Sequence, residues 1–363
     1  MIFKFALAVF LALAPFGAYA KIAAQPLEIS GWIPYWRTAT GTADALAHID
    51  IFKEINPFGY TVKNDGTLFD AMKIGEEPWT TLIAEAKKRK IRVIPTVMWS
   101  NTEAIHRILS NQKTRIALED NIAALVKEKE FDGIDIDFEG KKAETKNYFS
   151  TFLKGLYQRM GKKWVMCTIE ARTPLDSRYD TPPAGGPKDI RYANDFTAIN
   201  NYCDRVRLMT YDQGTIDLRL NKSALGPYIP VADSKWVEKV VNLTAKNISK
   251  KKLVIGVATY GYEFDVKPLA EGFRYNLISA FNQKYALDLA KDLGVFPQRN
   301  AAGELSFMHI STTTESFPLK LLWWSDASAI KDKINLAKKL GVRGIAIFKI
   351  DGGEDPAIWD ILR

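Results

Sequence analysis

A short acidic segment near the middle of the chain carries the residues best suited to chemistry. Between Phe131 and Gly140 acidic and apolar residues alternate strictly, which in a β-strand places the carboxylates on one face. On a half-exposed antiparallel strand that face would only contact water. Inside a parallel barrel, desolvation and mutual repulsion would keep at least one proton on it at neutral pH, which suits acid catalysis. This acidic row consists of Asp135, Asp137 and Glu139.

The spacing of the acidic row gives each carboxyl group a different task. Alternate residues of a strand lie about 6–7 Å apart, so Asp137 reaches both neighbours and can pass a proton between them. Glu139 comes last, nearest the end of the strand, and is the natural acid for protonating a leaving group. Asp132 precedes the row, and we expect it to hold the strand to its neighbours rather than to take part in chemistry.

Strand-like segments alternate with helical ones along the chain, which is the pattern of βα units around a parallel sheet. Eight such units without a clear linker favour a closed (β/α)8 TIM barrel, an α/β fold, over a doubly wound open sheet. In such a barrel the chemistry belongs at the carboxyl ends of the strands, where the acidic row ends. The expected strands are 29–36, 51–60, 91–98, 131–138, 164–170, 205–211, 253–260 and 343–350.

Helical spacing fills most gaps between the expected strands. We expect Ser234 to cap one of these helices and Asp326 to cap another. The last gap is the longest and holds more than one helix can fill. It predicts a small α+β insertion at about 263–325, between strands seven and eight, with a helix near 276–293. This insertion should form one wall of a cleft.

The beginning of the chain has the features of a secretory signal peptide. Lys4 precedes an apolar run over 5–15, and 18–20 is an Ala-Tyr-Ala cleavage signal. The run is shorter than the roughly 20 residues of a membrane-spanning helix, which disfavours the competing reading of an anchor. We therefore expect 1–20 to be removed, leaving 21–363 as a barrel domain without a membrane span, secreted or held in the periplasm or cell envelope.

Composition narrows the class of protein further. Of 363 residues, 47% are hydrophobic and 25% charged, so the chain can bury a large core. The formal net charge of +8 would draw an exported protein toward anionic envelope polymers, although scattered solubilising lysines are the simpler explanation. The basic runs 87–90 and 250–252 fall where helices should end, which suits the helix dipole and requires no nucleic acid.

The cysteines and histidines give no sign of a disulfide scaffold or a metal centre. Cys167 and Cys203 either pair in an oxidising compartment or remain two separately buried thiols. The histidines lack the spacing of metal ligands, so we expect no metal and no cofactor. The three histidines are His48, His106 and His309.

At this point the sequence resembles a known family. Residues 132–139 match the D-G-x-D-x-D-x-E signature of glycoside hydrolase family 18, the chitinase-like barrels, at the fourth strand, where that family carries it. Residues 208–212 resemble its M-x-Y-D motif at the sixth strand. Segments 31–36 and 253–261 resemble its first and seventh strands, so the resemblance covers the whole mature chain.

Within the family, the closest resemblance is to the bacterial envelope and spore-germination branch, which acts on peptidoglycan more than on chitin. Segments 56–60, 64–66 and 260–262 carry this finer resemblance. Residues 96–101 depart from the Ser-x-Gly-Gly motif usual at the third strand of chitinases, which weakens a strict chitinase assignment and is compatible with the envelope branch.

The resemblance implies a retaining mechanism in which the substrate's own acetamido oxygen is the nucleophile. Glu139 would protonate the glycosidic oxygen and later activate water. Asp137 would turn toward the acetamido N–H and stabilise the cyclic intermediate, while Asp135 would share a proton with Asp137. Tyr211 would hold the acetamido group by a hydrogen bond.

Other residues are expected to bind the sugar. The resemblance implies that Asp212 touches the reactive sugar and that Met209 packs beneath it. Trp36 and Tyr260 are the first candidates for flat rings that stack on sugars. Phe348 stands where the family usually places a Trp as the floor of the subsite, which predicts weaker substrate binding. The wider set of aromatic candidates adds Trp99, Tyr262, Trp323 and Trp324.

Three functions fit these observations. The first is a monomeric glycosidase on β-1,4-linked N-acetylglucosamine glycans, either chitin oligomers or peptidoglycan strands. The second is a catalytically silent glycan-binding protein on the same barrel, which the presence of Glu139 disfavours. The third is a barrel hydrolase with two catalytic carboxylates, such as Glu139 and Glu170, without need of the acetamido group. Glu170 and Arg172 either line the cleft or form a surface ion pair.

Overall fold

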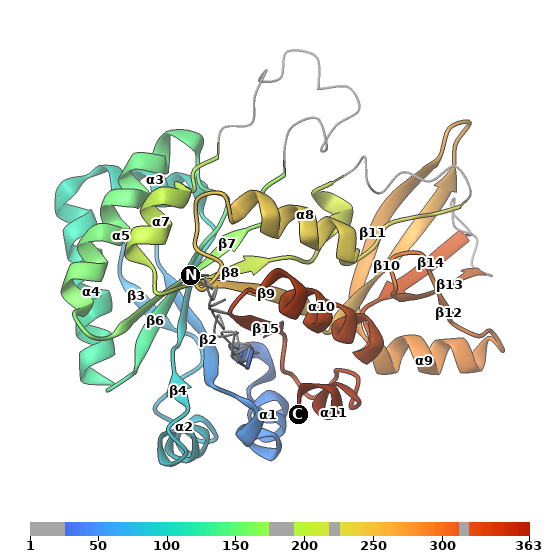
Figure 1. Ribbon diagram of the computed structural model, residues 1–363, viewed down its shortest axis with the longest axis horizontal. Coiled ribbons are helices and arrows are strands. Elements are labelled where there is room, and N and C mark those ends of the chain that lie inside the picture. The colour runs from blue at the N-terminus through green and yellow to red at the C-terminus, as the bar shows by residue number, and fades with distance from the viewer. Residues whose placement is uncertain (1–25, 174–191, 218–225, 312–318) are drawn as a thin grey trace, which may run out of the picture.

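A closed barrel of eight parallel strands forms the body of the molecule (Figure 1). The computed structural model describes residues 26–173, 192–217, 226–311 and 319–363. Strand β1 pairs with both β15 and β2, which closes the ring and confirms the expected (β/α)8 fold. The barrel strands are β1 (Glu28–Pro34), β2 (Glu54–Val62), β4 (Arg92–Val93) with β5 (Thr96–Trp99), β6 (Gly133–Phe138), β7 (Trp164–Glu170), β8 (Arg205–Met209), β9 (Leu253–Ala258) and β15 (Gly344–Phe348).

The third position of the barrel differs most from expectation. The segment expected as one strand over 91–98 forms two short strands, β4 and β5, which both pair with β2. Pro95 lies between them and has no backbone N–H to donate, which interrupts the ladder. A short strand, β3 (Leu68–Asp70), adds an antiparallel partner to the end of β2.

Helices cover the outer face of the barrel, and the apolar side chains of the strands pack against them. Ile134, Ile136 and Phe138 of β6 lie in this outer core, as their alternation predicts. The helices are α1 (Thr38–Ala47), α2 (Trp79–Lys88), α3 (Thr102–Ser110), α4 (Gln112–Glu128), α5 (Lys146–Met160), α7 (Phe196–Tyr202), α8 (Ser234–Thr244), α10 (Ala327–Leu340) and α11 (Ile358–Leu362), with short 3-10 turns η1 (Tyr35–Arg37), η2 (Ile49–Ile51), η3 (Ala143–Thr145) and η4 (Gln213–Thr215).

Acidic side chains cap the two helices for which caps were predicted. Asp326 accepts a hydrogen bond from the backbone N–H of Ala329, so this prediction is confirmed. The other prediction is wrong by one residue. Asp233, not Ser234, is the cap of α8, because its carboxylate accepts the backbone N–H of Lys235 while Ser234 is already helical.

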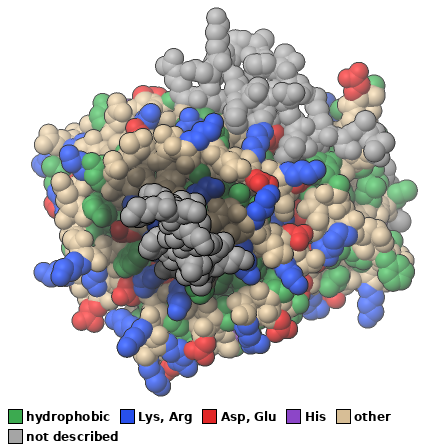
Figure 2. All heavy atoms as spheres, in the orientation of Figure 1, with side chains coloured by type: hydrophobic (Ala, Val, Ile, Leu, Met, Phe, Trp, Pro, Cys, Tyr) green, Lys and Arg blue, Asp and Glu red, His purple; other side chains and the backbone are tan. Residues whose placement is uncertain are grey.

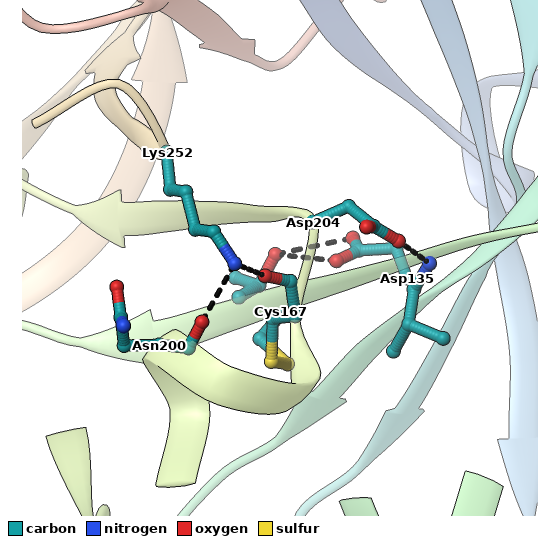
Figure 3. The surroundings of a disulfide bond; sticks show 8 residues. Asp135, Cys167, Asn200, Asp204 and Lys252 are labelled. Atoms are coloured by element: carbon teal, nitrogen blue, oxygen red, sulfur yellow. Dashed lines mark hydrogen bonds between the residues drawn. A yellow bond between two sulfur atoms is a disulfide. The ribbon is translucent and has the colours of Figure 1, made fainter. Parts of the chain in front are cut away.

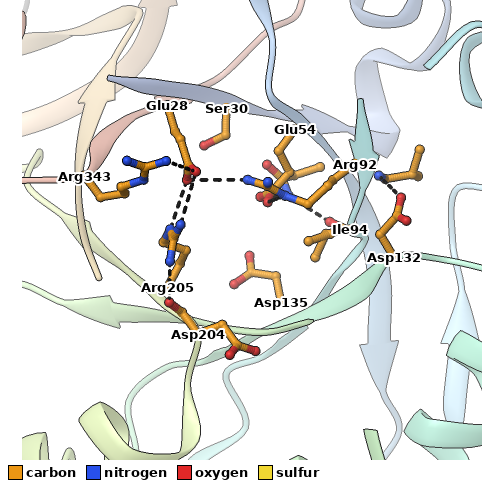
Figure 4. A network of polar contacts seen from close by, with 12 residues as sticks. Glu28, Ser30, Glu54, Arg92, Ile94, Asp132, Asp135, Asp204, Arg205 and Arg343 are labelled. Atoms are coloured by element: carbon orange, nitrogen blue, oxygen red, sulfur yellow. Dashed lines mark hydrogen bonds and ion pairs between the residues drawn. The ribbon is translucent and has the colours of Figure 1, made fainter. Parts of the chain in front are cut away.

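The interior of the barrel is unusually polar at the amino ends of its strands. Such interiors are generally filled by branched apolar side chains. Here Glu28 lies between Arg92, Arg205 and Arg343, and Arg92 continues to Glu54 (Figure 4). Although burial raises the pKa of Glu28, the hydrogen bonds from Arg205 and Arg343 outweigh it and lower the pKa to about 2. The Glu28 carboxylate is therefore charged at neutral pH.

A second sheet lies between β9 and β15 in sequence and beside the barrel in space, at the right of Figure 1. Its strands pair antiparallel in the order β11-β10-β14-β13-β12, and helix α9 (Gln283–Asp292) packs on it through Phe281, Phe307 and Trp324. The sheet consists of β10 (Tyr260–Pro268), β11 (Phe273–Asn282), β12 (Gln298–Arg299), β13 (Leu305–Ile310) and β14 (Leu319–Trp324).

The expected helix near 276–293 begins too early. Residues 273–282 form β11, which pairs with β10 along its whole length. Aromatic residues at positions 273 and 275 favour a strand, and the cross-strand hydrogen bonds to β10 decide in its favour. The helix therefore starts only at Gln283.

A disulfide bond joins Cys167 of β7 to Cys203, the residue that follows α7 (Figure 3). Both cysteines are fully buried, so the sequence was right about burial but left the pairing open. Next to the bond, the Nζ of Lys252 donates to the backbone oxygens of Asn200 and Cys203. The bond ties a strand of the barrel to the helix that covers it.

The surface mixes both signs of charge. Lys and Arg side chains are spread among acidic ones over the visible face (Figure 2), which agrees with the scattered distribution of lysines. Within the described ranges no helix is long and apolar enough to span a membrane. The predicted signal peptide, 1–20, lies outside the residues that the structure describes.

Candidate active site

The acidic row lies inside the barrel and ends at the carboxyl end of β6. Asp135 is completely buried and Asp137 is 3% exposed, whereas Glu139, just beyond the strand, is partly exposed. The backbone N–H of Glu139 donates to the carbonyl of Trp99, which holds this residue at the end of β5. Asp132, at the other end of the strand, accepts the backbone N–H of Val93 and thus ties β6 to β4.

Asp135 is surrounded by hydrogen-bond donors from the neighbouring strands. Its carboxylate accepts from Thr96 Oγ1 at 2.8 Å, from Thr168 Oγ1 at 2.9 Å and from the indole N–H of Trp32 at 3.1 Å. Arg207 Nη1 lies 2.9 Å from its Oδ2. Burial raises the pKa of Asp135 to about 6, even though the three hydrogen bonds lower it.

Asp137 lies between two other carboxylates with little compensation. Its Oδ1 is buried and has no hydrogen-bond partner in the part of the chain that the structure describes. Burial, followed by the charges of Glu139 and Asp135, raises the pKa of Asp137 well above its usual range. Asp137 is therefore the member of the row that retains a proton most readily.

Glu139 has a raised pKa for related reasons. Burial makes the largest contribution and the charge of Glu170 the next, while the charge of Lys141 acts in the opposite direction. Glu170 ends β7 and accepts from the backbone N–H of Gly140 at 2.9 Å and from Asn194 Nδ2 at 2.8 Å. Burial raises the pKa of Glu170, but Lys141, 3.6 Å away, and these hydrogen bonds leave it lowered. The two glutamates thus differ: the pKa of Glu139 is raised, whereas that of Glu170 is lowered.

The residues after β8 approach the acidic row from the side. Tyr211 is buried, and its pKa is raised by burial and then by the charge of Asp137. Asp212 has a left-handed backbone conformation, with φ of 59°, and its Oδ1 accepts the hydroxyls of Tyr260 at 2.8 Å and Tyr262 at 2.7 Å. Met209 is half-buried and packs on the same aromatic group.

An aromatic cluster centred on Phe348 forms the base of this region. The Phe348 ring is half-buried and stacks on Tyr211, with centroids 5.5 Å apart. Trp32, Phe58 and Tyr260 meet it edge-on. The position expected to form the sugar's floor is therefore aromatic, partly accessible and rigidly held.

Trp36 and Tyr260, the preferred sugar-binding aromatics, have different surroundings. Trp36 follows β1 and is 50% exposed, with its ring edge-on to Phe58. Tyr260 is buried and holds Asp212 through its hydroxyl, so it supports the site from behind rather than offering an open face. Tyr262 and Phe264 of the second sheet line a pocket of about 120 Å³ together with Asp212, which makes this sheet one of its walls.

Three of the wider aromatic candidates are wrong. Trp99 packs on Phe138 in the outer core, and its exposed fraction is 2%. Trp323 and Trp324 are buried in the two faces of the second sheet, and their indole N–H groups donate to Glu304 and Gln283. Side chains alternate between the two faces along β14, and both rings are buried because both faces of this sheet are covered.

Among the residues that the structure describes, Arg172 does not form the suggested surface ion pair with Glu170. Its guanidinium lies over the rings of Tyr192 and Phe196 instead, at 4.5 and 4.9 Å from their centroids. Within the described ranges no three His, Cys, Asp or Glu side chains are grouped so that they could hold a metal ion.

Sequence reasoning missed the groups that surround the acidic row. Alternation alone would place these residues on the inner faces of their strands, but only the pairing register of the strands shows which of them meet the row. Thr96, for example, is in register with Asp135, and this follows from the pairing of β5 with β6. The missed residues are Trp32, Thr96, Lys141, Thr168 and Arg207.

Known proteins resemble this chain in both sequence and fold. The model of the glycosyl hydrolases family 18 matches residues 32–353. The uncharacterized glycosylase YvbX of Bacillus subtilis is 25% identical over 300 residues, which cover 80% of this chain and 79% of that protein. The cortical fragment-lytic enzyme of the same organism is 25% identical over 318 residues, which cover 85% of this chain and 66% of that protein.

A solved structure agrees with the fold. The chitinase from Chromobacterium violaceum ATCC 12472 superposes with a TM-score of 0.72 at 19% identity, over 93% of this chain and 98% of that one. The family model spans nearly all of the barrel and the second sheet, and it includes the acidic row. The chain therefore belongs to family 18 of the glycosyl hydrolases and is a glycosidase.

Proposed function

We propose that this glycosidase cleaves β-1,4-linked N-acetylglucosamine glycans with retention of configuration, using the acetamido oxygen of its substrate as nucleophile. The observation that carries the proposal is the arrangement of Asp137 and Glu139. Burial and the charges of neighbouring carboxylates raise the pKa of both, and Glu139 lies at the open end of the row. A protonated acid at the barrel mouth with a proton-sharing neighbour is what this reaction requires.

In the first step Glu139 donates its proton to the glycosidic oxygen, and the bond from this oxygen to the anomeric carbon breaks. The acetamido oxygen forms a bond to the same carbon from the opposite face. Asp137 accepts the acetamido N–H and stabilises the positive charge of the cyclic intermediate. In the second step the Glu139 carboxylate takes a proton from water, whose oxygen attacks the anomeric carbon and reopens the ring. Two inversions give net retention.

The surrounding residues have supporting roles in this proposal. Tyr211 donates its hydroxyl to the acetamido oxygen, which it can do because its raised pKa keeps it protonated. Asp212 contacts the reactive sugar, with Tyr260 holding it in position. Phe348 forms the floor beneath the sugar, with Met209 at its side, and the exposed ring of Trp36 stacks on a neighbouring sugar.

Peptidoglycan strands are the proposed natural polymer, with chitin oligomers as substitutes. One relative, of which this chain covers 66%, is named a cortical fragment-lytic enzyme. Action outside the cytoplasm is consistent with the disulfide, since such bonds persist in oxidising compartments. We accordingly place the mature protein in the periplasm or cell envelope, or outside the cell.

The experiment that tests the proposal measures product release from N-acetylglucosamine oligomers and from purified peptidoglycan. We expect Glu139→Gln to reduce kcat by roughly 10²- to 10⁴-fold, because the acid is lost while the shape is kept. Glu144→Gln is the matched control and should retain activity, because Glu144 is exposed in the short 3-10 turn η3 that follows the row. Glycan binding without product release by the unaltered protein would instead support the silent glycan-binding alternative.

A second measurement separates the acetamido mechanism from one with two catalytic carboxylates. Both oxygens of Glu170 are held by described donors, Gly140 and Asn194, which leaves this carboxylate poorly placed to attack a sugar. We therefore expect no turnover of oligomers from which the acetyl groups have been removed. Rapid hydrolysis of those oligomers, lost in Glu170→Gln, would favour the two-carboxylate reading.

A further inference from the structure

Arg207 lies buried directly beneath the acidic row. It projects from β8 into the barrel, and its exposed fraction is 1%. Its Nη1 lies 2.9 Å from Asp135 Oδ2, while Nη2 contacts the Oε1 of Glu54. The guanidinium carbon lies 5.2 Å from the centre of the Trp32 ring, whose indole N–H donates to the same oxygen of Asp135.

The other partner of Arg207 does not explain why this arginine is buried. Glu54 already accepts Arg92 Nε at 3.1 Å and Asn56 Nδ2 at 3.0 Å, so it has a cation and an amide without Arg207. Figure 4 shows Arg92 between Glu54 and Glu28, with Asp135 farther along the barrel interior. Removing a guanidinium from water is energetically costly, and barrel interiors usually avoid that cost. Asp135, in contrast, has no other cation within ion-pair distance in the described ranges.

We propose that Arg207 is a positioning residue for catalysis, which holds Asp135 as an anion directed down the barrel, so that the proton shared by Asp135 and Asp137 stays on Asp137, next to Glu139. This inference rests on the proposed function, because it assigns the proton to the carboxyl group that must turn toward the substrate. Without Arg207, Asp135 would compete with Asp137 for that proton, since both are fully enclosed.

The expected pH dependence of kcat/KM reflects every charged group that faces Asp135. Asp137 and Glu139 face it along β6, Arg207 from β8 with Glu54 behind it, and Tyr211 from the segment that follows β8. The donors from β1, β5 and β7 are uncharged; they are Trp32, Thr96 and Thr168. Removing one positive charge from a coupled set of carboxyl groups makes each loss of a proton harder and raises all of its macroscopic pKa values.

The test is the pH profile of kcat/KM for Arg207→Met, Arg207→Lys and Arg205→Met. The ascending limb reports the proton that the Asp135 and Asp137 pair must lose, so we expect Arg207→Met to shift this limb to higher pH by about one unit or more. Arg207→Lys should restore most of the shift. Arg205→Met removes an arginine from the same strand that pairs with Glu28 and not with the row, and should leave the limb in place. An unmoved limb in Arg207→Met, or an equal shift in Arg205→Met, would overturn the proposal.

A second variant, for which a shift in the opposite direction is expected, tests the proposal if Arg207→Met does not fold. Glu54→Gln removes the other carboxylate that contacts Arg207, so the guanidinium interacts with Asp135 alone and the ascending limb should move to lower pH. No movement would count against the proposal. An infrared titration of the carboxyl bands, with Asp135→Asn to identify the signal of Asp135, gives the same answer without turnover. If the unaltered protein releases no product, the proposed function fails, whereas the titration still shows whether Arg207 keeps Asp135 ionised.

Discussion

At the scale of single residues, Glu139 and Glu170 show how two side chains of the same type acquire opposite shifts in pKa. Both side chains are partly buried, at the ends of neighbouring strands. Glu170 is compensated by Lys141 and two hydrogen bonds, so its pKa is lowered. Glu139 has burial and the negative charge of Glu170 acting on it together, so its pKa is raised. In the proposed mechanism the proton donor is distinguished by its surroundings rather than by its residue type.

Lys141 provides a test of this balance. Glu139 must be protonated to act, so kcat/KM should fall as the pH rises through its raised pKa. The positive charge of Lys141 lowers that pKa, and Lys141→Met should therefore raise it and move the descending limb of the profile to higher pH. Lys142→Met is the control, because Lys142 pairs at 2.6 Å with the exposed Glu103 and not with the site. A descending limb that moves to lower pH in Lys141→Met would contradict the assignment of Glu139 as the acid.

At the scale of elements, β6 depends on its neighbours to make its acidic face tolerable. Thr96 of β5 and Thr168 of β7 donate to Asp135 from both sides, and Arg207 of β8 adds the charge. Strand β7 is in turn fixed by the disulfide from Cys167 to Cys203 (Figure 3). The bond therefore supports one side of the acidic row.

Removing the disulfide should lower stability with little direct effect on the chemistry. The bond closes a loop between residues 36 apart in the sequence, for which chain entropy predicts a loss of about 3–4 kcal/mol in the free energy of unfolding. The variant carrying both Cys167→Ala and Cys203→Ala should show this loss in a denaturant titration. Reductant should destabilise the unaltered protein and leave the variant unchanged. Equal stability of the two proteins would mean that packing alone holds β7 in place.

At the scale of the whole molecule, a barrel and a second sheet together shape the site. Tyr260 and Tyr262, at the beginning of the second sheet, donate their hydroxyls to Asp212, which lines the pocket together with Tyr262. The molecule as a whole carries a formal net charge of +8, and Figure 2 shows this charge spread over the visible face rather than gathered in one patch. On that face, attraction to an anionic polymer would therefore be general and not directed to one patch.

This charge predicts different salt responses for two kinds of substrate. Release of product from anionic peptidoglycan should slow as ionic strength rises toward about 0.15 M, because the attraction is screened. Hydrolysis of uncharged N-acetylglucosamine oligomers should change little over the same range. Measuring both rates on one enzyme preparation controls for any effect of salt on stability. An equal loss on both substrates would show that the net charge has no part in reaching the polymer.

The sequence by itself determined the barrel and the acidic row. Both depend on local periodicity. Apolar residues recur at every second position in the strands and at every third or fourth position in the helices, and acidic residues occupy every second position of 135–139. Local patterns also indicated the α+β insertion, although the helix within it was placed too early. The strand over 273–282 is stabilised by its hydrogen bonds to the adjacent strand β10, and the periodicity of a segment does not show whether it has such a partner.

Only the tertiary structure decided which side chains meet the row. The register between strands brings Thr96 and Thr168 to Asp135, and inward projection from β8 brings Arg207 beneath it. The same is true of the aromatic residues. Trp324 and Trp36 look alike in the sequence, but the first is covered on its sheet and the second remains half exposed after β1. Pairing and burial depend on distances between segments far apart in the chain, and these exist only once the barrel has closed.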